Sequence, residues 1–135
     1  MKTFSNITSI FLLACCAASG HSDRGVAAQT VSLTFGTEGK ATFEVTNSRL
    51  LTITLQIGQA SYSVPTNVCT RLRDIRFDTV RLCWNGSYKS AGEADYFYLQ
   101  FNMGPPRLGP PPDVPPVELK FRNGKFQKAT GIDLP

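Results

Sequence analysis

The sequence predicts an all-β fold, an antiparallel β-sandwich or small barrel of about eight strands with one disulfide. Apolar and polar residues alternate with a period of two in most segments after residue 30. Glycine and asparagine turn signals separate these segments, and no stretch keeps the period of an amphipathic helix. Alternate side chains of a strand lie on opposite faces, so this pattern is typical of sheets with one buried face.

Three strands are expected in the first half of the domain. Residues 31–35 and 41–45 alternate between apolar and polar side chains on either side of a glycine-containing turn at 36–39. These two strands therefore form a predicted hairpin. Residues 51–57 repeat the same alternation and supply the third strand.

The middle of the chain is less regular. A short strand is expected around residues 62–64, and Pro65 ends it or places it at a sheet edge. Residues 68–73 are ambiguous and fit a single turn of helix. Residues 80–84 alternate again, with Trp84 on the core side.

Two Asn-Gly pairs mark turns in the last part of the chain. Asn85-Gly86 predicts a tight hairpin turn that leads to a strand over residues 96–101. Asn123-Gly124 separates residues 117–121 from a final strand around Phe126, which predicts a second hairpin.

The chain begins with the pattern of an export signal. Lys2 precedes an apolar run from Ile7 to Ala14, which is too short to span a bilayer about 30 Å thick. The run leads into Leu12-Leu13-Ala14-Cys15, which resembles the lipobox of bacterial lipoproteins. The resemblance implies cleavage before Cys15 and attachment of a lipid to this cysteine.

A plain signal peptide is the alternative interpretation. Cleavage after Gly20 or Ala28 would suit a signal peptidase, because small residues precede both positions. That route removes Cys15 and Cys16, whereas lipidation leaves Cys16 as an odd thiol. The expected organisation is a signal peptide with its lipobox at 1–20, a flexible tether at 21–30 and a single all-β domain at 31–135. The protein would then lie at the periplasmic face of a bacterial membrane, or free in the periplasm or medium.

The two cysteines of the domain, Cys69 and Cys83, are expected to form a disulfide in an oxidising compartment. In the chain-entropy model, a bridge that closes so short a loop stabilises the fold by about 3 kcal/mol. The sequence has no Cys-X-X-Cys motif, which favours a structural bridge over a redox site.

The net charge of +4 is modest and, with export, argues against a nucleic-acid partner. Basic and acidic residues do cluster between positions 71 and 81. We interpret this run as a solvated, locally paired surface or as a patch that recognises an acidic partner or anionic envelope polymers. Its members are Arg71, Arg73, Arg76 and Arg81, with Asp74 and Asp78.

Few side chains are available for catalysis. His21, the one histidine of the sequence, falls in the leader or the tether. The domain therefore has no histidine for a Ser/His/Asp or Cys/His site, or for a zinc site of the usual type. Glu93 and Asp95 share the spacing of a carboxylate pair, but their position before an apolar strand favours a charged turn. We expect no catalytic activity, metal or cofactor.

The first candidate binding surface is the Pro-rich loop at 104–116. Proline fixes φ and favours an extended path, so this loop is stiff for its length and loses little entropy on binding. Its residues Arg107, Leu108 and Asp113 are the ones expected to meet a partner. The alternative is a passive connection whose prolines discourage edge-to-edge strand pairing.

The second candidate surface is the outer sheet face expected to carry Arg81, Tyr96 and Tyr98. Tyrosines with a nearby arginine are enriched at interface hot spots, because aromatic rings bury a large area at a low entropic cost. Alternatively, these side chains are half-buried and serve packing.

These observations favour a non-enzymatic binding module of the bacterial envelope. By analogy with other small exported β-proteins, the leading hypothesis is an inhibitor or immunity protein against a toxin or a cell-wall hydrolase. The alternative is a structural or accessory lipoprotein subunit of an envelope assembly. Both hypotheses predict a protein partner and, through a lipid on Cys15, contact with a membrane.

Overall fold

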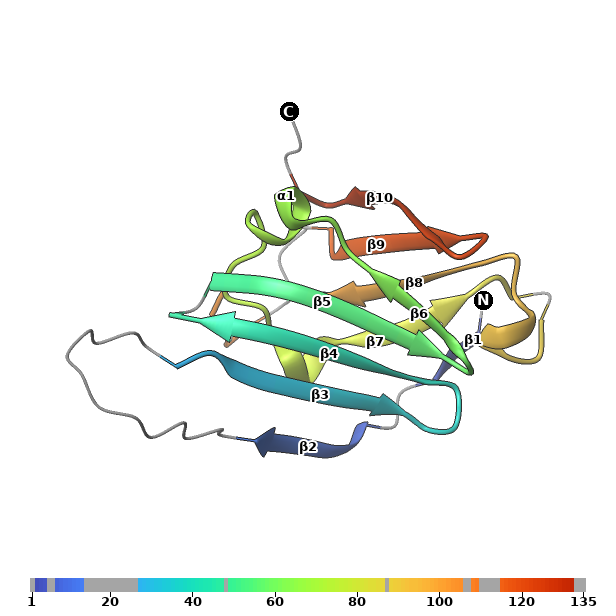
Figure 1. The fold of residues 1–135 in the computed structure, drawn as a ribbon, viewed down its shortest axis with the longest axis horizontal. Coiled ribbons are helices and arrows are strands. Elements are labelled where there is room, and N and C mark those ends of the chain that lie inside the picture. Colours follow the sequence, from blue (N-terminus) through green and yellow to red (C-terminus); the bar gives the residue numbers. More distant parts are fainter. Residues whose placement is uncertain are drawn as a thin grey trace.

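The all-β prediction is confirmed by the computed structural model, which describes residues 2–4, 7–13, 27–47, 49–86, 88–105, 108–109 and 115–132 (Figure 1). For residues 2–4 and 7–13 only the backbone pairing is described. The strands are β1 (Lys2–Phe4), β2 (Ile7–Leu13), β3 (Gln29–Phe35), β4 (Gly39–Thr46), β5 (Arg49–Ile57), β6 (Ala60–Ser63), β7 (Arg81–Trp84), β8 (Tyr96–Phe101), β9 (Val117–Arg122) and β10 (Lys125–Thr130). The helical elements are α1 (Thr66–Cys69) and two single 3₁₀ turns, Phe77–Thr79 and Ala91–Glu93.

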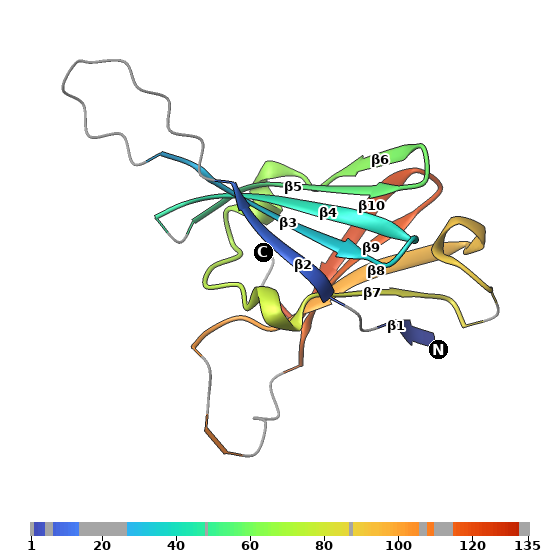
Figure 2. The ribbon, with the colours of Figure 1, turned by 90° about the horizontal axis from the view of Figure 1, so that it is seen from below.

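The strands form two antiparallel sheets, which Figure 2 shows as two layers. One sheet has the order β1-β7-β8-β9-β10 and the other has the order β2-β3-β4-β5-β6. The chain between β6 and β7 crosses from one layer to the other at one end of the molecule (Figure 2). A single apolar core fills the space between the layers, since it contains buried residues of both sheets.

The two-residue period of the sequence becomes rows of buried side chains across each sheet. In the first sheet the register aligns Leu82 with Leu99 and Leu99 with Leu119, and all three are fully buried. In the second sheet Phe43 pairs with Val31 on one side and Ile53 on the other. Directly opposed residues of antiparallel strands share a face, so each row covers one strip of the core.

An aromatic cluster joins the layers. The ring of Phe121 stacks on Phe97 with centroids 5.5 Å apart and meets Phe126 edge-on at 5.8 Å. Tyr62 reaches from β6 in the opposite sheet and contacts the same two stacked rings at 5.1 and 5.9 Å. Edge-to-face pairs of this kind add to the free energy gained from burial.

The predicted disulfide is not present, because Cys69 and Cys83 are both free thiols. Cys69 lies on α1 within the core, and its Sγ is 3.7 Å from the carbonyl oxygen of Val64. Cys83 lies on β7 between Leu82 and Trp84, two residues that face the core, so its own side chain projects from the outer face. The two thiols thus belong to opposite sides of a sheet.

Only one of the two Asn-Gly pairs makes the predicted tight turn. Asn123 and Gly124 have φ values of 50° and 76°, and Arg122 pairs with Lys125 across them. The prediction at Asn85-Gly86 is wrong, because the connection continues to residue 95 before β8 begins.

A buried indole explains this longer connection. Trp84 is fully buried, and its Nε1 donates a hydrogen bond of 3.3 Å to the carbonyl oxygen of Tyr88. The backbone N–H of Tyr88 in turn donates to the carbonyl oxygen of Asn85 at 3.2 Å. The chain folds back here because a buried indole N–H needs an acceptor.

Residues assigned to the signal peptide contribute strand pairing in the full chain. β2 pairs with β3, and β1 pairs with β7, both antiparallel. β3 begins at Gln29, so the last two positions of the predicted tether belong to a strand. The lipidation prediction at Cys15 and the remaining tether positions up to residue 26 lie outside the described residues.

No helix in the described part of the chain is long and apolar enough to cross a membrane.

Candidate binding pocket at the end of the sheets

The segment from Leu72 to Asp78 closes one end of the two layers. Its backbone forms an isolated bridge between Arg73 and Arg49 at the start of β5, and another between Ile75 and Met103 just after β8. Two backbone hydrogen bonds of 2.9 Å, from Arg76 N–H to Asn102 and from Gly104 N–H to Asp74, reinforce the second bridge. The segment is therefore tied to both sheets.

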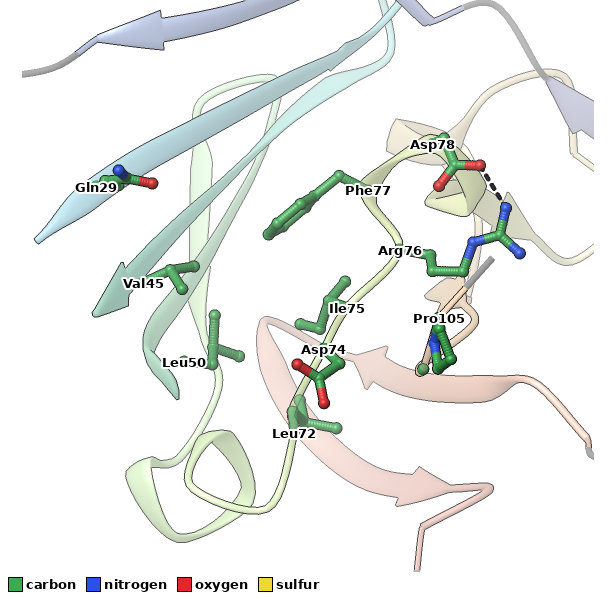
Figure 3. Close-up of a pocket in the computed structure, with 11 residues that line it drawn as sticks. Gln29, Val45, Leu50, Leu72, Asp74, Ile75, Arg76, Phe77, Asp78 and Pro105 are labelled. Carbon is green, nitrogen blue, oxygen red and sulfur yellow. Dashed lines mark hydrogen bonds and ion pairs between the residues drawn. The ribbon is translucent and has the colours of Figure 1, made fainter. Parts of the chain in front are cut away.

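This segment lines an open cavity of about 760 Å³ (Figure 3). Apolar side chains from β4, β5, the crossing segment and the loop after β8 form its wall, and charged or polar ones stand at its border. The apolar lining consists of Val45, Leu50, Leu72, Ile75, Phe77 and Pro105, and the polar lining includes Gln29, Asp74, Arg76 and Asp78. We call this cavity the end pocket.

Local structure explains how the apolar wall is built. Asp74 has a φ of 50°, a left-handed conformation that aspartate tolerates better than most residues, and the chain turns there. The following residues Ile75 and Phe77 point toward the same space as Val45 (Figure 3). Phe77 is held by an edge-on contact with the buried ring of Phe43, with centroids 5.2 Å apart.

Arg76 is the polar feature that points to a ligand. Its Nη2 forms an ion pair of 2.8 Å with Asp78 Oδ2. Its Nε is buried and has no hydrogen-bond partner among the described residues. The Arg76 side chain as a whole is 29% exposed, so a small side-chain movement would let a ligand oxygen reach Nε and serve as its acceptor.

The predicted face with Arg81, Tyr96 and Tyr98 is only partly available. All three residues lie on the outer side of the first sheet, but Arg81 pairs with Gln100 and not with either tyrosine. Tyr96 is 39% exposed, whereas Tyr98 is 5% exposed and lies beside Cys83 and Lys120. The packing role weighed for this face therefore applies to Tyr98, and Tyr96 remains accessible.

Lys120 and Glu118 cover Tyr98. The ammonium group of Lys120 is 5.9 Å from the centroid of the Tyr98 ring and 3.4 Å from Glu118 Oε2. Glu118 also accepts hydrogen bonds of 3.4 Å from Gln100 and Thr130. A shallow hollow borders these residues, but its polar groups already bond one another, so it is a weaker candidate than the end pocket.

Burial makes the phenol of Tyr98 a weaker acid than usual. Desolvation, with added repulsion from Cys83 and Glu118, raises the pKa of Tyr98 to about 12. The folded state holds the phenolic proton more tightly than the unfolded state. The contribution of this group to the free energy of unfolding is therefore fully present below about pH 10 and is lost as the pH rises toward 12.

The free energy of unfolding of the wild-type protein should fall between pH 9 and pH 11, and the Tyr98→Phe variant should fall by about 1 kcal/mol less, because it lacks the phenolic proton. Urea titrations at both pH values test this, and equal losses in the two proteins would contradict it.

The Pro-rich loop is described only in part. Leu108 is fully exposed. Arg107 and Asp113 lie outside the described residues. At the start of the loop, Gly104 and Pro105 line the end pocket, so the loop leaves the domain beside this cavity.

The arginine cluster contains a local ion pair at Arg76, as one of its two interpretations predicted. Arg76 bonds Asp78 within the cluster, and both residues belong to the pocket border. Sequence reasoning missed the apolar residues between these charges. The signal was present, since Leu72, Ile75 and Phe77 interrupt an otherwise charged run.

Within the described ranges, no group of three or more His, Cys, Asp and Glu side chains is placed to hold a metal ion.

Comparisons with known proteins identify no relative. No family model, no curated protein and no solved structure matches the chain.

Proposed function

We propose that the protein is an exported, non-enzymatic binding module that captures a partner protein in the end pocket of a two-layer β-sandwich. The observation that carries this proposal is an apolar cavity bordered by Arg76, whose buried Nε has no hydrogen-bond partner within the described part of the chain. In its specific form, the protein is an inhibitor or immunity protein that holds a toxin or cell-wall hydrolase inactive in the envelope. A lipid on Cys15 would keep it at the periplasmic face of the membrane.

The composition of the pocket defines what the partner must supply. The wall formed by Ile75, Phe77 and Leu50 suits one aliphatic or aromatic side chain, whose full burial is worth about 1.5–3 kcal/mol. Arg76 Nε suits a carbonyl or carboxylate oxygen next to that side chain. An exposed loop of a folded protein presents both groups together, because each residue carries a side chain and a backbone carbonyl.

Affinity capture with matched charge substitutions tests the proposal. The secreted protein, tagged at its C-terminus, is used to retain partners from envelope extract and from a panel of purified wall hydrolases. Ile75→Lys should reduce retention of the partner at least tenfold, because it places an ammonium group in the apolar wall. Leu51→Lys adds the same charge at a residue that is 42% exposed on β5, outside the pocket lining, and should retain the partner normally.

Thermal unfolding of both variants separates loss of binding from loss of fold. Equal retention by a folded Ile75→Lys protein would contradict the role of the end pocket. Retention of a large membrane assembly in place of a hydrolase or toxin would favour the accessory-subunit alternative.

A further inference from the structure

β3 is an internal strand whose neighbour on one side, β2, belongs to the predicted signal peptide. Its seven residues, Gln29–Phe35, include no charged residue and no proline. β4 pairs with it on one side and β2 on the other. Sheet edges exposed to solvent are usually protected by charges, proline or bulges, so β3 has the composition of an internal strand.

Export would turn β3 into an edge. β2 spans Ile7–Leu13, and each predicted cleavage position, before Cys15 or after Gly20 or Ala28, lies downstream of it. Cleavage at any of them removes the whole of β2. The backbone N–H and C=O groups that β3 directs toward β2 then lose their partners.

Removal of β2 would also uncover apolar side chains at this edge of the core. Val31, Leu33 and Phe35 of β3 face the core and are buried in the full chain. The backbone register places Leu12 opposite Val31 and Ile10 opposite Leu33, so β2 is the strand that borders these buried positions. Loss of β2 leaves an apolar border beside unpaired backbone groups.

We infer that the exported protein uses the β3 edge to bind an extended, uncharged strand of a partner in antiparallel pairing. The occupant is defined by β2, whose seven residues are also uncharged. The full chain pairs it with this edge in regular register from Leu13 opposite Thr30 to Ile10 opposite Leu33, and a register shift precedes the pair of Ile7 with Phe35. A partner strand with apolar residues at alternate positions would restore both the backbone hydrogen bonds and the apolar cover. This inference rests on the proposed export, and Gln29 is the one β3 residue in the lining of the end pocket as the described residues form it.

The other strand that export would uncover is a weaker site. β7 has four residues, begins with the charged Arg81, and pairs with β1 at three positions only. A longer uncharged edge offers more backbone groups for pairing with an incoming strand, and it has no charged side chain that would discourage this pairing. β3 is therefore the edge to test.

The test uses a synthetic peptide with the sequence of residues 5–14, carrying a solubilising tail and a fluorophore. Mass spectrometry first establishes the N-terminus of the secreted protein. The peptide should bind this protein saturably, and N-methylation of alternate backbone amides should weaken binding at least tenfold without changing its side chains. A full-length precursor made uncleavable should bind the peptide at least tenfold more weakly, because its own β2 occupies the edge.

Several results would overturn the inference. A secreted chain that retains residues 7–13, no binding of the peptide, or equal binding of the N-methylated peptide would each exclude the site. A secreted protein that forms stable dimers through β3, seen by sedimentation and by exchange protection of residues 29–35, would identify a second copy as the occupant instead. Folded Ile75→Lys protein should bind the peptide normally, so failure of the end pocket and failure of the β3 edge remain distinguishable.

Discussion

Replacement of Phe121 by alanine is expected to lower the free energy of unfolding by about 3–5 kcal/mol. Phe121 is fully buried, and its ring contacts Phe97, Phe126 and, from the opposite sheet, Tyr62. Alanine would leave a cavity at the point where the two layers meet. Because domains of this size are stable by about 5–15 kcal/mol in total, the variant should be largely unfolded at moderate urea concentrations.

Urea denaturation followed by the fluorescence of Trp84, the one tryptophan in the sequence, measures this effect. Leu51→Ala is the matched control, because it also removes an apolar side chain but from an exposed position on β5. The control should change the free energy of unfolding by less than about 0.5 kcal/mol. Similar losses in the two variants would show that the aromatic cluster is not the centre of the core.

Gly131→Ala is expected to destabilise the protein by about 2–4 kcal/mol through two separate effects. Gly131 has a φ of 78°, a conformation that costs an L-residue free energy. A Cβ at this position would also collide with the carbonyl oxygen of Pro116 and approach Val117 Cα to 3.1 Å. Both neighbours are backbone atoms at the start of β9, so they cannot move without disturbing the sheet.

Gly124→Ala separates the two effects. Gly124 has a nearly identical φ of 76°, but a Cβ there would meet no heavy atom within 4 Å. This variant should lose only the conformational part, about 1 kcal/mol. Equal losses at Gly131 and Gly124 would show that close approach to Pro116 contributes nothing, and would leave the packing of β10 against the end of the Pro-rich loop unsupported.

The sheets were predictable because strand formation here depends on a local pattern. Alternation of Leu82 with Cys83 and of Leu99 with Tyr98 already assigns each residue to a face, and register only has to align the rows. Turn chemistry was less reliable. The same Asn-Gly pair turns tightly at 123–124 and not at 85–86, because the indole of Trp84 requires the carbonyl of Tyr88.

The disulfide prediction failed for a related reason. Chain spacing between Cys69 and Cys83 was compatible with a bridge, but spacing does not fix the direction of a side chain. β7 directs Cys83 outward, whereas α1 directs Cys69 into the core. The alternation that placed Trp84 inside also placed its neighbour Cys83 on the other face, so the sequence contained the information against a bridge.

The end pocket was not predictable from the sequence because its wall comes from distant parts of the chain. Val45 and Leu50 flank one connection, Ile75 and Phe77 belong to another, and Pro105 begins a third. Their meeting depends on the bridges that tie residues 73 and 75 to opposite sheets. The predicted residues Arg81, Tyr96 and Tyr98 lie on a single sheet face, which is the kind of site that strand alternation alone can indicate.

Hydrogen exchange of the secreted protein, free and bound to its captured partner, tests the proposed binding mode most directly. We predict slower exchange of backbone amides at residues 72–78 of the end pocket and at residues 29–35 of β3 in the complex. Exchange should stay unchanged at residues 96–98 of β8 and 118–122 of β9, in the other sheet. Protection confined to these two strands, with none at 72–78, would contradict the proposal that the protein binds its partner through the end of the sandwich.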